Sequence, residues 1–244
     1  MSIKPDYRSR IYDKYASRFQ EAPEQFEPAA ADHWGRAYKS YLKGWLPKQK
    51  DAAVLEVGCG GGRLLHFLKT RRFTNFTGVD ISPEQILLAQ QVTSRVVRAD
   101  AIEFLKATNN EYDLIIGLDF IEHLRKNEVL DFLTNCHKAL KPDGRIILQT
   151  PNAQSPFGQS IFYGDFTHEF CFTPKALQHV LNLCGFHKFH VRETGPVVHG
   201  FKSVIRYILW QTIRLILKLW NLIETGDCTN EVFTRTFVIS AHKI

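Results

Sequence analysis

Residues 54–63 read Val54-Leu55-Glu56-Val57-Gly58-Cys59-Gly60-Gly61-Gly62-Arg63, an apolar run that ends in a turn of glycines. The apolar spacing that follows predicts a helix from about residue 62 to residue 71. Glycines in such a turn allow the backbone to approach a ligand closely, and the helix N-terminus offers free N–H groups. The stretch therefore predicts a strand, a turn and a helix, with a ligand site at the carboxyl end of the strand.

The spacing of the glycines excludes two common nucleotide-binding loops. A dinucleotide fingerprint, GxGxxG, counted from Gly58 would require a glycine at the position of Arg63. A Walker loop would require Gly-Lys followed by Ser or Thr, and no such triplet follows the turn. The GxGxG form that is present fits a ligand without a pyrophosphate.

The chain after residue 50 alternates β-branched runs with helical stretches, which predicts βαβ units on a parallel sheet. The expected strands lie near residues 53–57, 76–80, 95–98, 112–117, 145–150, 188–193 and 232–241. The expected helices lie near residues 62–71, 82–92, 101–105, 128–140, 174–184 and 201–224. Lys141-Pro142-Asp143-Gly144 predicts a stop and a turn after the fourth of these helices.

Two further segments complete the predicted organisation. Residues 1–50 carry no strand signal, so we expect a helical N-terminal extension on one domain of residues 51–244, with no second domain. The stretch from residue 151 to residue 173 is polar and aromatic without a period. So long a loop inside a compact domain is usually functional.

Two carboxylates follow neighbouring strands and, with the glycine turn, describe a nucleoside pocket. Asp80 ends the second expected strand, where a carboxylate can accept hydrogen bonds from both hydroxyls of a ribose. Asp100 follows the third strand, where it would reach an adenine amino group, with Ala101 and Ile102 beside the ring. An α/β nucleotide binder of another kind is the alternative.

Five motifs resemble those of the class I S-adenosylmethionine-dependent methyltransferases. They are Glu56-Val57-Gly58-Cys59-Gly60-Gly61-Gly62, Gly78-Val79-Asp80-Ile81-Ser82, Arg98-Ala99-Asp100-Ala101, Tyr112-Asp113-Leu114-Ile115-Ile116 and Leu140-Lys141-Pro142-Asp143-Gly144-Arg145. Together they span roughly residues 52–151 in the family's order and spacing. The resemblance implies a Rossmann-like, doubly wound α/β fold with a mostly parallel seven-stranded sheet and an antiparallel last strand. It also implies S-adenosylmethionine as the cofactor.

The resemblance assigns roles to residues of these motifs. The glycines would wrap the methionine portion, Asp80 would bind the ribose, and Asp100 would bind the adenine amino group. Asp119 would lie beside the methionine or the acceptor. The expected cofactor-binding residues are Glu56, Gly58, Gly60, Gly62, Asp80, Ile81, Asp100, Ala101 and Asp119.

A candidate base for methyl transfer follows the fourth strand. Transfer from a sulfonium is an in-line displacement, so the protein mainly supplies alignment and a water-poor site. A hydroxyl acceptor must also lose its proton, and His123 can titrate near neutrality. The pair Glu122-His123 resembles that of small-molecule O-methyltransferases. The alternative is a structural histidine that hydrogen-bonds the loop.

Further candidate catalytic residues lie in the loop after the fifth strand. Asp165, His168 and Glu169 fall within five residues and are framed by aromatic side chains, which suits a polyhydroxylated sugar. The segment resembles the Asp-x-Thr-His segment of methyltransferases in bacterial surface-polysaccharide clusters. The predicted catalytic residues are therefore His123, His168 and Asp165. His123 with Asp165, His168 or Glu169 could also hold a divalent metal, but these residues lie on separate loops without metal-ligand spacing, so no metal is expected.

Composition excludes several classes of protein. Hydrophobic residues make up 44% of the 244 residues and charged residues 23%, which excludes a disordered or collagen-like chain. Five cysteines without a CxxC pair argue against a disulfide framework and a structural zinc site. The first 18 residues lack the continuous apolar core of a secretory signal, so we expect a cytoplasmic protein.

The formal charge of +6 is concentrated in two segments. Residues 1–50 carry ten Lys and Arg against six Asp and Glu, residues 201–224 carry four against one, and all four tryptophans lie in these segments. Residues 201–224 form an amphipathic pattern, and their longest uncharged run, residues 207–213, is too short to span a bilayer. One interpretation is an interfacial helix that makes a peripheral membrane contact on anionic lipid. The other is a long helix buried against the domain or a dimer partner.

The leading functional hypothesis is an O-methyltransferase that acts on a hydroxyl of a sugar or of a glycolipid or polysaccharide precursor. The alternative acceptor is a quinone or another lipophilic phenol, which would place the enzyme at the inner face of the cytoplasmic membrane. Nucleic acid is not expected as a partner, because the chain has neither a base-flipping motif nor a run of basic residues. A non-catalytic S-adenosylmethionine-binding module is a further alternative.

Overall fold

The structure is a computed structural model that describes residues 6–21, 23–109, 111–227 and 232–244. The start of the expected N-terminal extension and Cys228 lie outside these described residues. The other four cysteines, Cys59, Cys136, Cys171 and Cys184, are free thiols.

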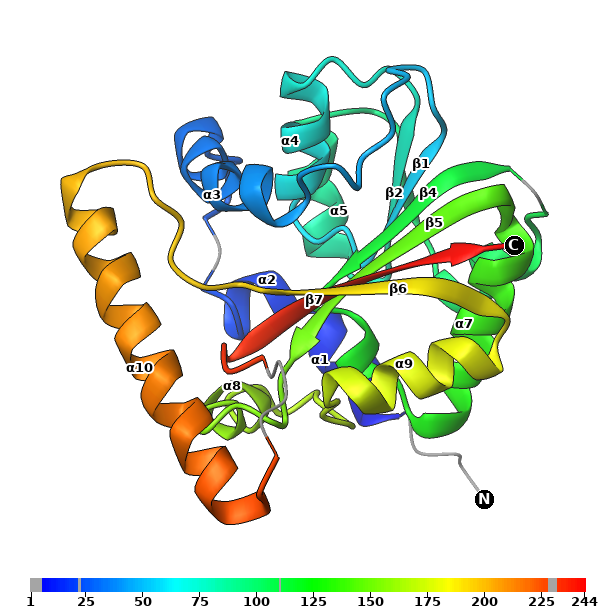
Figure 1. The fold of residues 1–244 in the computed structure, drawn as a ribbon. Helices are drawn as coiled ribbons and strands as arrows, with labels where there is room; N and C mark the ends of the chain where they lie inside the picture. Colours follow the sequence, from blue (N-terminus) through cyan, green and yellow to red (C-terminus); the bar gives the residue numbers. More distant parts are fainter. Residues whose placement is uncertain (1–5, 22, 110, 228–231) are drawn as a thin grey trace.

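The described residues contain one seven-stranded sheet (Figure 1). Its strands are β1 (Val54–Val57), β2 (Phe76–Asp80), β3 (Val96–Arg98), β4 (Tyr112–Leu118), β5 (Leu140–Pro151), β6 (Phe186–Glu193) and β7 (Thr236–Lys243). The spatial order is β3-β2-β1-β4-β5-β7-β6, and only β7 is antiparallel to its neighbours. The predicted fold class, with an antiparallel last strand, is confirmed.

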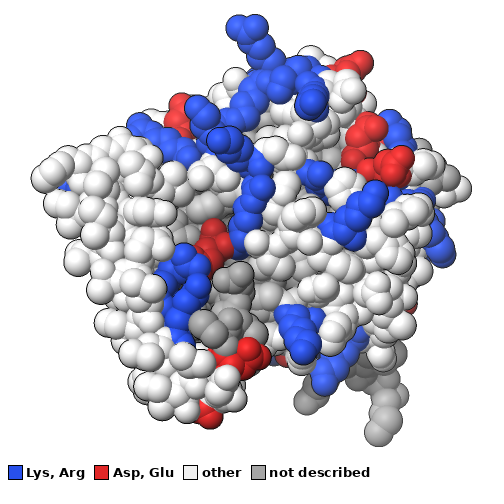
Figure 2. Space-filling model, in the orientation of Figure 1, with Lys and Arg blue, Asp and Glu red and all other residues white. Residues whose placement is uncertain are grey.

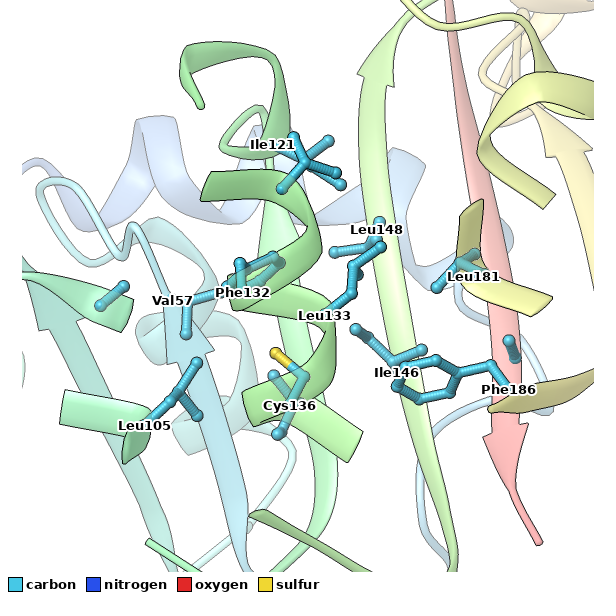
Figure 3. Close-up of a cluster of buried hydrophobic side chains, with 14 of the residues drawn as sticks. Val57, Leu105, Ile121, Phe132, Leu133, Cys136, Ile146, Leu148, Leu181 and Phe186 are labelled. Atoms are coloured by element: carbon cyan, nitrogen blue, oxygen red, sulfur yellow. The ribbon is translucent and has the colours of Figure 1, made fainter. Parts of the chain in front are cut away.

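Helices cover both faces of the sheet. α3 (Pro28–Tyr41), α4 (Arg63–Thr70) and α5 (Pro83–Gln90) lie on one face. α6 (Ala101–Lys106), α7 (Lys126–Ala139) and α9 (Pro174–Leu183) lie on the other. A core of fully buried side chains, among them Val57, Phe132 and Leu148, fills the space beneath this second layer (Figure 3). Because both faces are covered, the central strands read as continuous apolar runs.

The strand order reverses at β1, which pairs with β2 on one side and with β4 on the other. The loops after β1 and β4 therefore lead to opposite faces of the sheet and leave a crevice between them. The glycine turn follows β1. A short 3-10 helix, η1 (Ile121–His123), follows β4. The sequence thus folds so that the two predicted motifs meet at one point.

Three strand and loop boundaries differ from the prediction. β5 begins at Leu140 rather than near residue 145, because the predicted turn is a bulge inside the strand in which Asp143 has φ 59°. β7 begins at Thr236 rather than near residue 232. The long loop after β5 contains a short helix, α8 (Gln159–Phe162), and a β-bridge between Asn152 and Phe172.

Two short N-terminal helices, α1 (Tyr7–Tyr12) and α2 (Tyr15–Arg18), lie at the carboxyl edge of the sheet. The Arg8 guanidinium donates two hydrogen bonds, of 2.6 and 2.8 Å, to the Glu128 carboxylate. The Tyr15 hydroxyl donates to Asp165 over 2.6 Å. These contacts place the helices over the first turn of α7 and the loop that follows β5.

The helix expected over residues 201–224 is α10 (Phe201–Thr225), and Figure 1 shows it at the edge of the molecule, outside the layers around the sheet. Ser203 is its one buried residue. The interpretation of this segment as a helix buried against its own domain is therefore wrong. In the described part of the chain, no helix combines the length and the apolar character needed to cross a membrane.

Candidate active site

A cavity of about 950 Å³ opens at the carboxyl ends of β1, β2 and β4. This volume lies within the range of pockets that hold small ligands and cofactors. The predicted site residues that line it are Glu56, Gly58, Gly60, Asp80, Ile81, Asp100, Ala101, Asp119 and His123. Side chains of α1 and α2, among them Tyr12 and Tyr15, form part of its wall.

The glycine turn approaches its surroundings too closely for side chains. Gly58 has φ 64°, and a Cβ there would lie 2.6 Å from the Phe120 ring. Gly60 has φ 48° and donates its N–H to Asp80 over 2.9 Å. Gly62 does not line the cavity; with φ 87° it precedes α4, and a Cβ would lie 3.1 Å from the backbone of Ala89. Because Gly62 has no side chain, α4 can pack closely against α5.

Asp80 is fixed by the backbone on both sides. Its two carboxylate oxygens accept hydrogen bonds from the N–H groups of Gly60 and Ser82, at 2.9 and 2.8 Å. Burial raises the pKa of Asp80, and these hydrogen bonds act in the opposite direction. Each oxygen keeps a further lone pair, which a pair of neighbouring hydroxyls could use.

Asp100 caps the N-terminus of α6. Its Oδ1 accepts the N–H groups of Ile102 and Glu103, at 2.9 and 3.0 Å. Asp100 lines the cavity, and its Oδ2 accepts no hydrogen bond from the described residues. The cap orients the carboxylate and leaves one oxygen for a ligand donor such as an amino group.

Glu56 is a buried carboxylate in the wall of the cavity. Among the described residues, Oε2 finds no hydrogen-bond partner. Burial, with the nearby charge of Asp80, raises the pKa of Glu56 well above its usual range. A buried polar atom without a partner carries a desolvation cost, which a ligand with a hydrogen-bond donor would remove.

Asp119 occupies a strained backbone conformation with φ 51° at the end of β4. Both of its oxygens accept the amide of Gln149, at 2.9 and 3.0 Å, and the Gln149 carbonyl oxygen accepts the Tyr38 hydroxyl at 2.9 Å. Burial raises the pKa of Asp119. Such strained, fully supported residues are concentrated at functional sites.

His123 belongs to a chain of hydrogen bonds that fixes its tautomer. Thr167 Oγ1 donates to Asp165 over 2.6 Å and lies 2.8 Å from His123 Nδ1. Burial raises the pKa of Asp165, but hydrogen bonds from Thr167 and Tyr15 outweigh it, so this carboxyl is ionised and can only accept. The single Thr167 hydrogen is thus committed, and Nδ1 of His123 must donate to Thr167. In this tautomer Nε2 is the unprotonated nitrogen and carries the lone pair of the ring, which also lies beside the backbone of Asp119.

The protonation state of His123 follows from its surroundings. Burial, with His168 nearby, lowers the pKa of His123 to about 4. The imidazole is therefore neutral at physiological pH and able to accept a proton. The rings of Tyr12 and Tyr15 meet it edge-on, each with centroids 6.5 Å away.

His168 lies beside His123 but does not line the cavity. The two ring centroids are 4.7 Å apart, and His168 Nδ1 donates to the carbonyl of Phe162 over 2.7 Å. Ligand atoms of Glu122, His123 and His168 lie within 4.8 Å of one another, so these three residues could hold a metal ion. The structure thus brings both histidines together despite their separate loops. Asp165 and Glu169 are not part of this group.

Several residues of the site carried no signal of their own in the sequence. Thr167 lies within the Asp-x-Thr-His segment, but its role as a link appears only when the loop is folded. The N-terminal segment holds Tyr15 and Tyr38, and β5 holds Gln149. Polar and aromatic residues are common in such segments, so none of the three stands out in the sequence. Burial of their polar atoms is what marks them, and burial is not visible in a single sequence.

The family of the chain follows from a comparison with family models. A model described as a methyltransferase domain matches residues 18–191, which is more than half of the chain. The chain belongs to this methyltransferase domain family. The predicted enzyme class is confirmed at this level, and so is the predicted cofactor, S-adenosylmethionine, which solved neighbours of the same fold contain.

Curated relatives match part of the chain. The Escherichia coli (strain K12) cyclopropane-fatty-acyl-phospholipid synthase is 28% identical over 97 residues, 40% of this chain and 25% of that protein. The Rickettsia bellii (strain OSU 85-389) ubiquinone biosynthesis O-methyltransferase is 33% identical over 110 residues, 42% of this chain and 43% of that protein. The chain thus matches less than half the length of these relatives.

Solved structures share the fold over nearly the whole chain. A SAM-dependent methyltransferase from Archaeoglobus fulgidus has a TM-score of 0.64 at 24% identity and covers 98% of this chain and 100% of its own. Phosphoethanolamine N-methyltransferase 2 from Haemonchus contortus, in complex with S-adenosyl-L-methionine, has a TM-score of 0.60 at 14% identity. It covers 95% of this chain and 60% of its own. At these identities the likeness establishes the fold.

Proposed function

We propose that the chain transfers the methyl group of S-adenosylmethionine to a hydroxyl of a small acceptor, with His123 as the general base. The observation that supports this most directly is the place of His123, with Nδ1 held by Thr167 and Nε2 unprotonated, in the wall of a cavity large enough for the cofactor. Bound S-adenosylmethionine supplies a sulfonium methyl group, which the acceptor oxygen takes as the carbon–sulfur bond breaks. His123 Nε2 accepts the hydroxyl proton, and Asp165, through Thr167, stabilises the imidazolium that forms.

The cofactor-binding residues divide by the part of the ligand they suit. Asp80 would accept the ribose hydroxyls and Asp100 the adenine amino group, with Ile81 and Ala101 beside the ring. Glu56 would receive a donor from the methionine portion, because its Oε2 has no partner among the described residues. Gly58 and Gly60 would allow that portion to reach the backbone. We assign Gly62 to the start of α4 instead of a cofactor contact.

The acceptor that we propose is a sugar hydroxyl on a glycolipid or polysaccharide precursor, in the cytoplasm. Exposed aromatic side chains of Tyr163 and Phe166 in the loop after β5 could stack on the apolar face of a sugar. Two carboxylates expected to bind sugar hydroxyls have internal partners instead. Asp165 accepts Tyr15 and Thr167, and Glu169 accepts the Tyr7 hydroxyl over 2.5 Å.

A quinone or another lipophilic phenol is the second candidate acceptor. The internal hydrogen bonds of Asp165 and Glu169 favour this acceptor, because they reduce the polar surface available to a sugar. Apolar side chains such as Phe120 and Leu124 line the cavity beside His123. The partial match to ubiquinone biosynthesis O-methyltransferases points in the same direction. A panel of polyprenyl-linked sugars and polyprenylated catechols, assayed for transfer of a labelled methyl group, distinguishes the two acceptor classes.

Two substitutions test the assignment of the site. Asp80→Ala should weaken cofactor binding about tenfold or more, because it removes charge-assisted hydrogen bonds to the ribose. His123→Ala should leave cofactor binding unchanged and lower kcat about a hundredfold or more, because it removes the base. Calorimetric titration with S-adenosylmethionine and turnover of the identified acceptor measure the two effects. Equal cofactor affinity in wild type and Asp80→Ala, or full turnover in His123→Ala, would contradict the assignment.

A chelator separates two roles of His123. As a free base, His123 supports turnover that is insensitive to a chelator. As one of three ligands with Glu122 and His168, it would require a divalent cation. If chelation abolished turnover and added Mg²⁺ or Zn²⁺ restored it, His123 would be assigned as a metal ligand and not as the base.

A further inference from the structure

α10 is oriented opposite to an ordinary surface helix. The residues on its less exposed side are mainly polar and include Gln211, Arg214, Lys218 and Asn221. Arg214 pairs with Glu193 of β6 over 3.2 Å and donates to Gln211. Surface helices of globular proteins turn their apolar stripe toward the core. α10 instead turns a polar stripe toward the protein.

The outward side of α10 is apolar over the whole length of the helix. Exposed fractions reach 67% for Leu215, 66% for Trp220 and 77% for Ile223. At about 100° per residue, one half of the helical wheel collects the large exposed aliphatic residues. Those with more than half of their surface exposed are Ile208, Leu209, Leu215, Ile216, Leu219 and Ile223. A continuous apolar strip of this extent marks a surface that meets a partner protein or a membrane.

Three of the four basic residues of α10 lie at the borders of this apolar strip, and the fourth, Arg214, faces inward. Lys202 and Arg206 fall along one border and Lys218 along the other, and the one acidic residue of the helix is Glu224 in its last turn. In Figure 2 the outward side of α10 is white nearly throughout, while Lys and Arg gather where the helix meets the rest of the molecule. Cations at the edges of an apolar face are the arrangement of helices that lie in a membrane interface.

We propose that α10 lies in the plane of an anionic lipid bilayer, with its apolar strip among the acyl chains and its cations among the phosphates. Charge favours lipid over a second copy of the chain. The strip has Lys202, Arg206 and Lys218 at its borders and a single acid, Glu224, so a facing copy would supply one carboxylate for three cations, whereas lipid phosphates can pair with all of them. The membrane contact depends on the proposed function in one respect: it would bring the enzyme to an acceptor that is carried by lipid.

Vesicle flotation tests the membrane contact without any assay of activity. The full chain should float with vesicles of phosphatidylcholine mixed with phosphatidylglycerol, and less with phosphatidylcholine alone. High salt should weaken the binding to the mixed vesicles. No flotation with the anionic vesicles would overturn the proposal. A chain that floats but transfers no methyl group would overturn the proposed function alone.

Matched substitutions locate the contact. Leu215→Glu combined with Leu219→Glu should lower vesicle binding about tenfold or more, because two leucines no longer enter the acyl region. Leu183→Glu, at an equally exposed leucine of α9, is the control and should bind as wild type. Each of Lys202→Ala and Lys218→Ala should lower binding to anionic vesicles about fivefold. Unchanged S-adenosylmethionine affinity in every variant shows that the fold is intact.

Two outcomes would contradict a contact between the apolar strip and lipid. Vesicle binding that survives Leu215→Glu with Leu219→Glu would place the lipid contact elsewhere. A dimer in light scattering that these substitutions dissociate, without vesicle binding by the wild type, would make a second copy the occupant and overturn the lipid proposal.

Discussion

Glu56 has a buried carboxyl group in the wall of the cofactor cavity, and its Oε2 has no hydrogen-bond partner among the described residues. This arrangement lowers the stability of the folded protein but leaves an acceptor for a ligand. The pKa of Glu56 in the folded state is raised, mainly by burial, so the folded protein retains a proton that the unfolded chain releases above about pH 4.3. The unfolded state therefore gains relative to the folded state as the pH rises from that value toward the raised pKa.

Glu56→Gln should stabilise the protein at neutral pH, because glutamine mimics the protonated carboxyl. We expect the melting temperature to rise by at least the roughly 2–4 °C that 1 kcal/mol represents in a domain of this size. The gain should disappear below about pH 4.3, where both states are protonated. Cofactor affinity should fall in the same variant. Thermal unfolding across this pH range measures the first effect, and an equal gain at all pH values would contradict the assigned pKa.

Thr167 acts as a positioning residue between Asp165 and His123. Thr167→Val keeps the shape but removes the hydroxyl, so His123 loses the acceptor that fixes its tautomer. We expect kcat to fall about tenfold, with the KM for S-adenosylmethionine unchanged. Thr167→Ser should restore turnover, because the hydroxyl returns. Steady-state kinetics of the three forms measure this, and a Thr167→Ser variant as slow as Thr167→Val would argue against the link.

Among the elements, α1 is held at the site by polar contacts and by the rings of Tyr7 and Tyr12, which meet Phe166 and His123 edge-on. No residue of α1 is buried, and Arg8, with 15% of its side chain exposed, bridges to Glu128 of α7. The strongest of its polar contacts are this ion pair and the hydrogen bond of the Tyr7 hydroxyl to Glu169. Elements with few buried apolar contacts open at low free-energy cost.

Arg8→Ala should release α1 from the cavity without unfolding the domain. We expect faster chymotryptic cleavage in residues 7–15 and a rate of cofactor dissociation that rises severalfold, with little change in melting temperature. Arg10→Ala, on the exposed side of the same helix, is the control. Stopped-flow displacement of the cofactor and timed proteolysis provide the measurements. Identical cleavage rates in Arg8→Ala and wild type would show that the ion pair does not hold α1.

The elements themselves were accessible from the sequence, whereas the contacts between their loops were not. Ser82 and Pro83 mark the start of α5, and Thr173 and Pro174 that of α9, through capping chemistry that is local. The chain from His123 through Thr167 to Asp165 joins loops 44 residues apart. Its geometry depends on how η1 meets the loop after β5, which no periodicity encodes.

At the scale of the whole molecule, the distribution of charge and apolar surface follows the division into layers. The sheet and its two helical layers enclose the core and the cavity. The two basic, tryptophan-bearing segments take different places, since Trp45 is buried on the α3 side of the sheet and Trp220 is exposed on α10. The sequence grouped these segments by composition, and only the structure separates the one that packs from the one that stays outside.

The position of β7 between β5 and β6 has a consequence for biosynthesis. Neither β5 nor β6 has its neighbour on that side until residues 236–243 have left the ribosome. α10 precedes β7 in the chain and so emerges while the sheet is still open. An apolar helix that appears before the fold closes is available to a lipid surface, or to a chaperone, during synthesis. The order of translation would then allow the membrane to be reached before the sheet is complete.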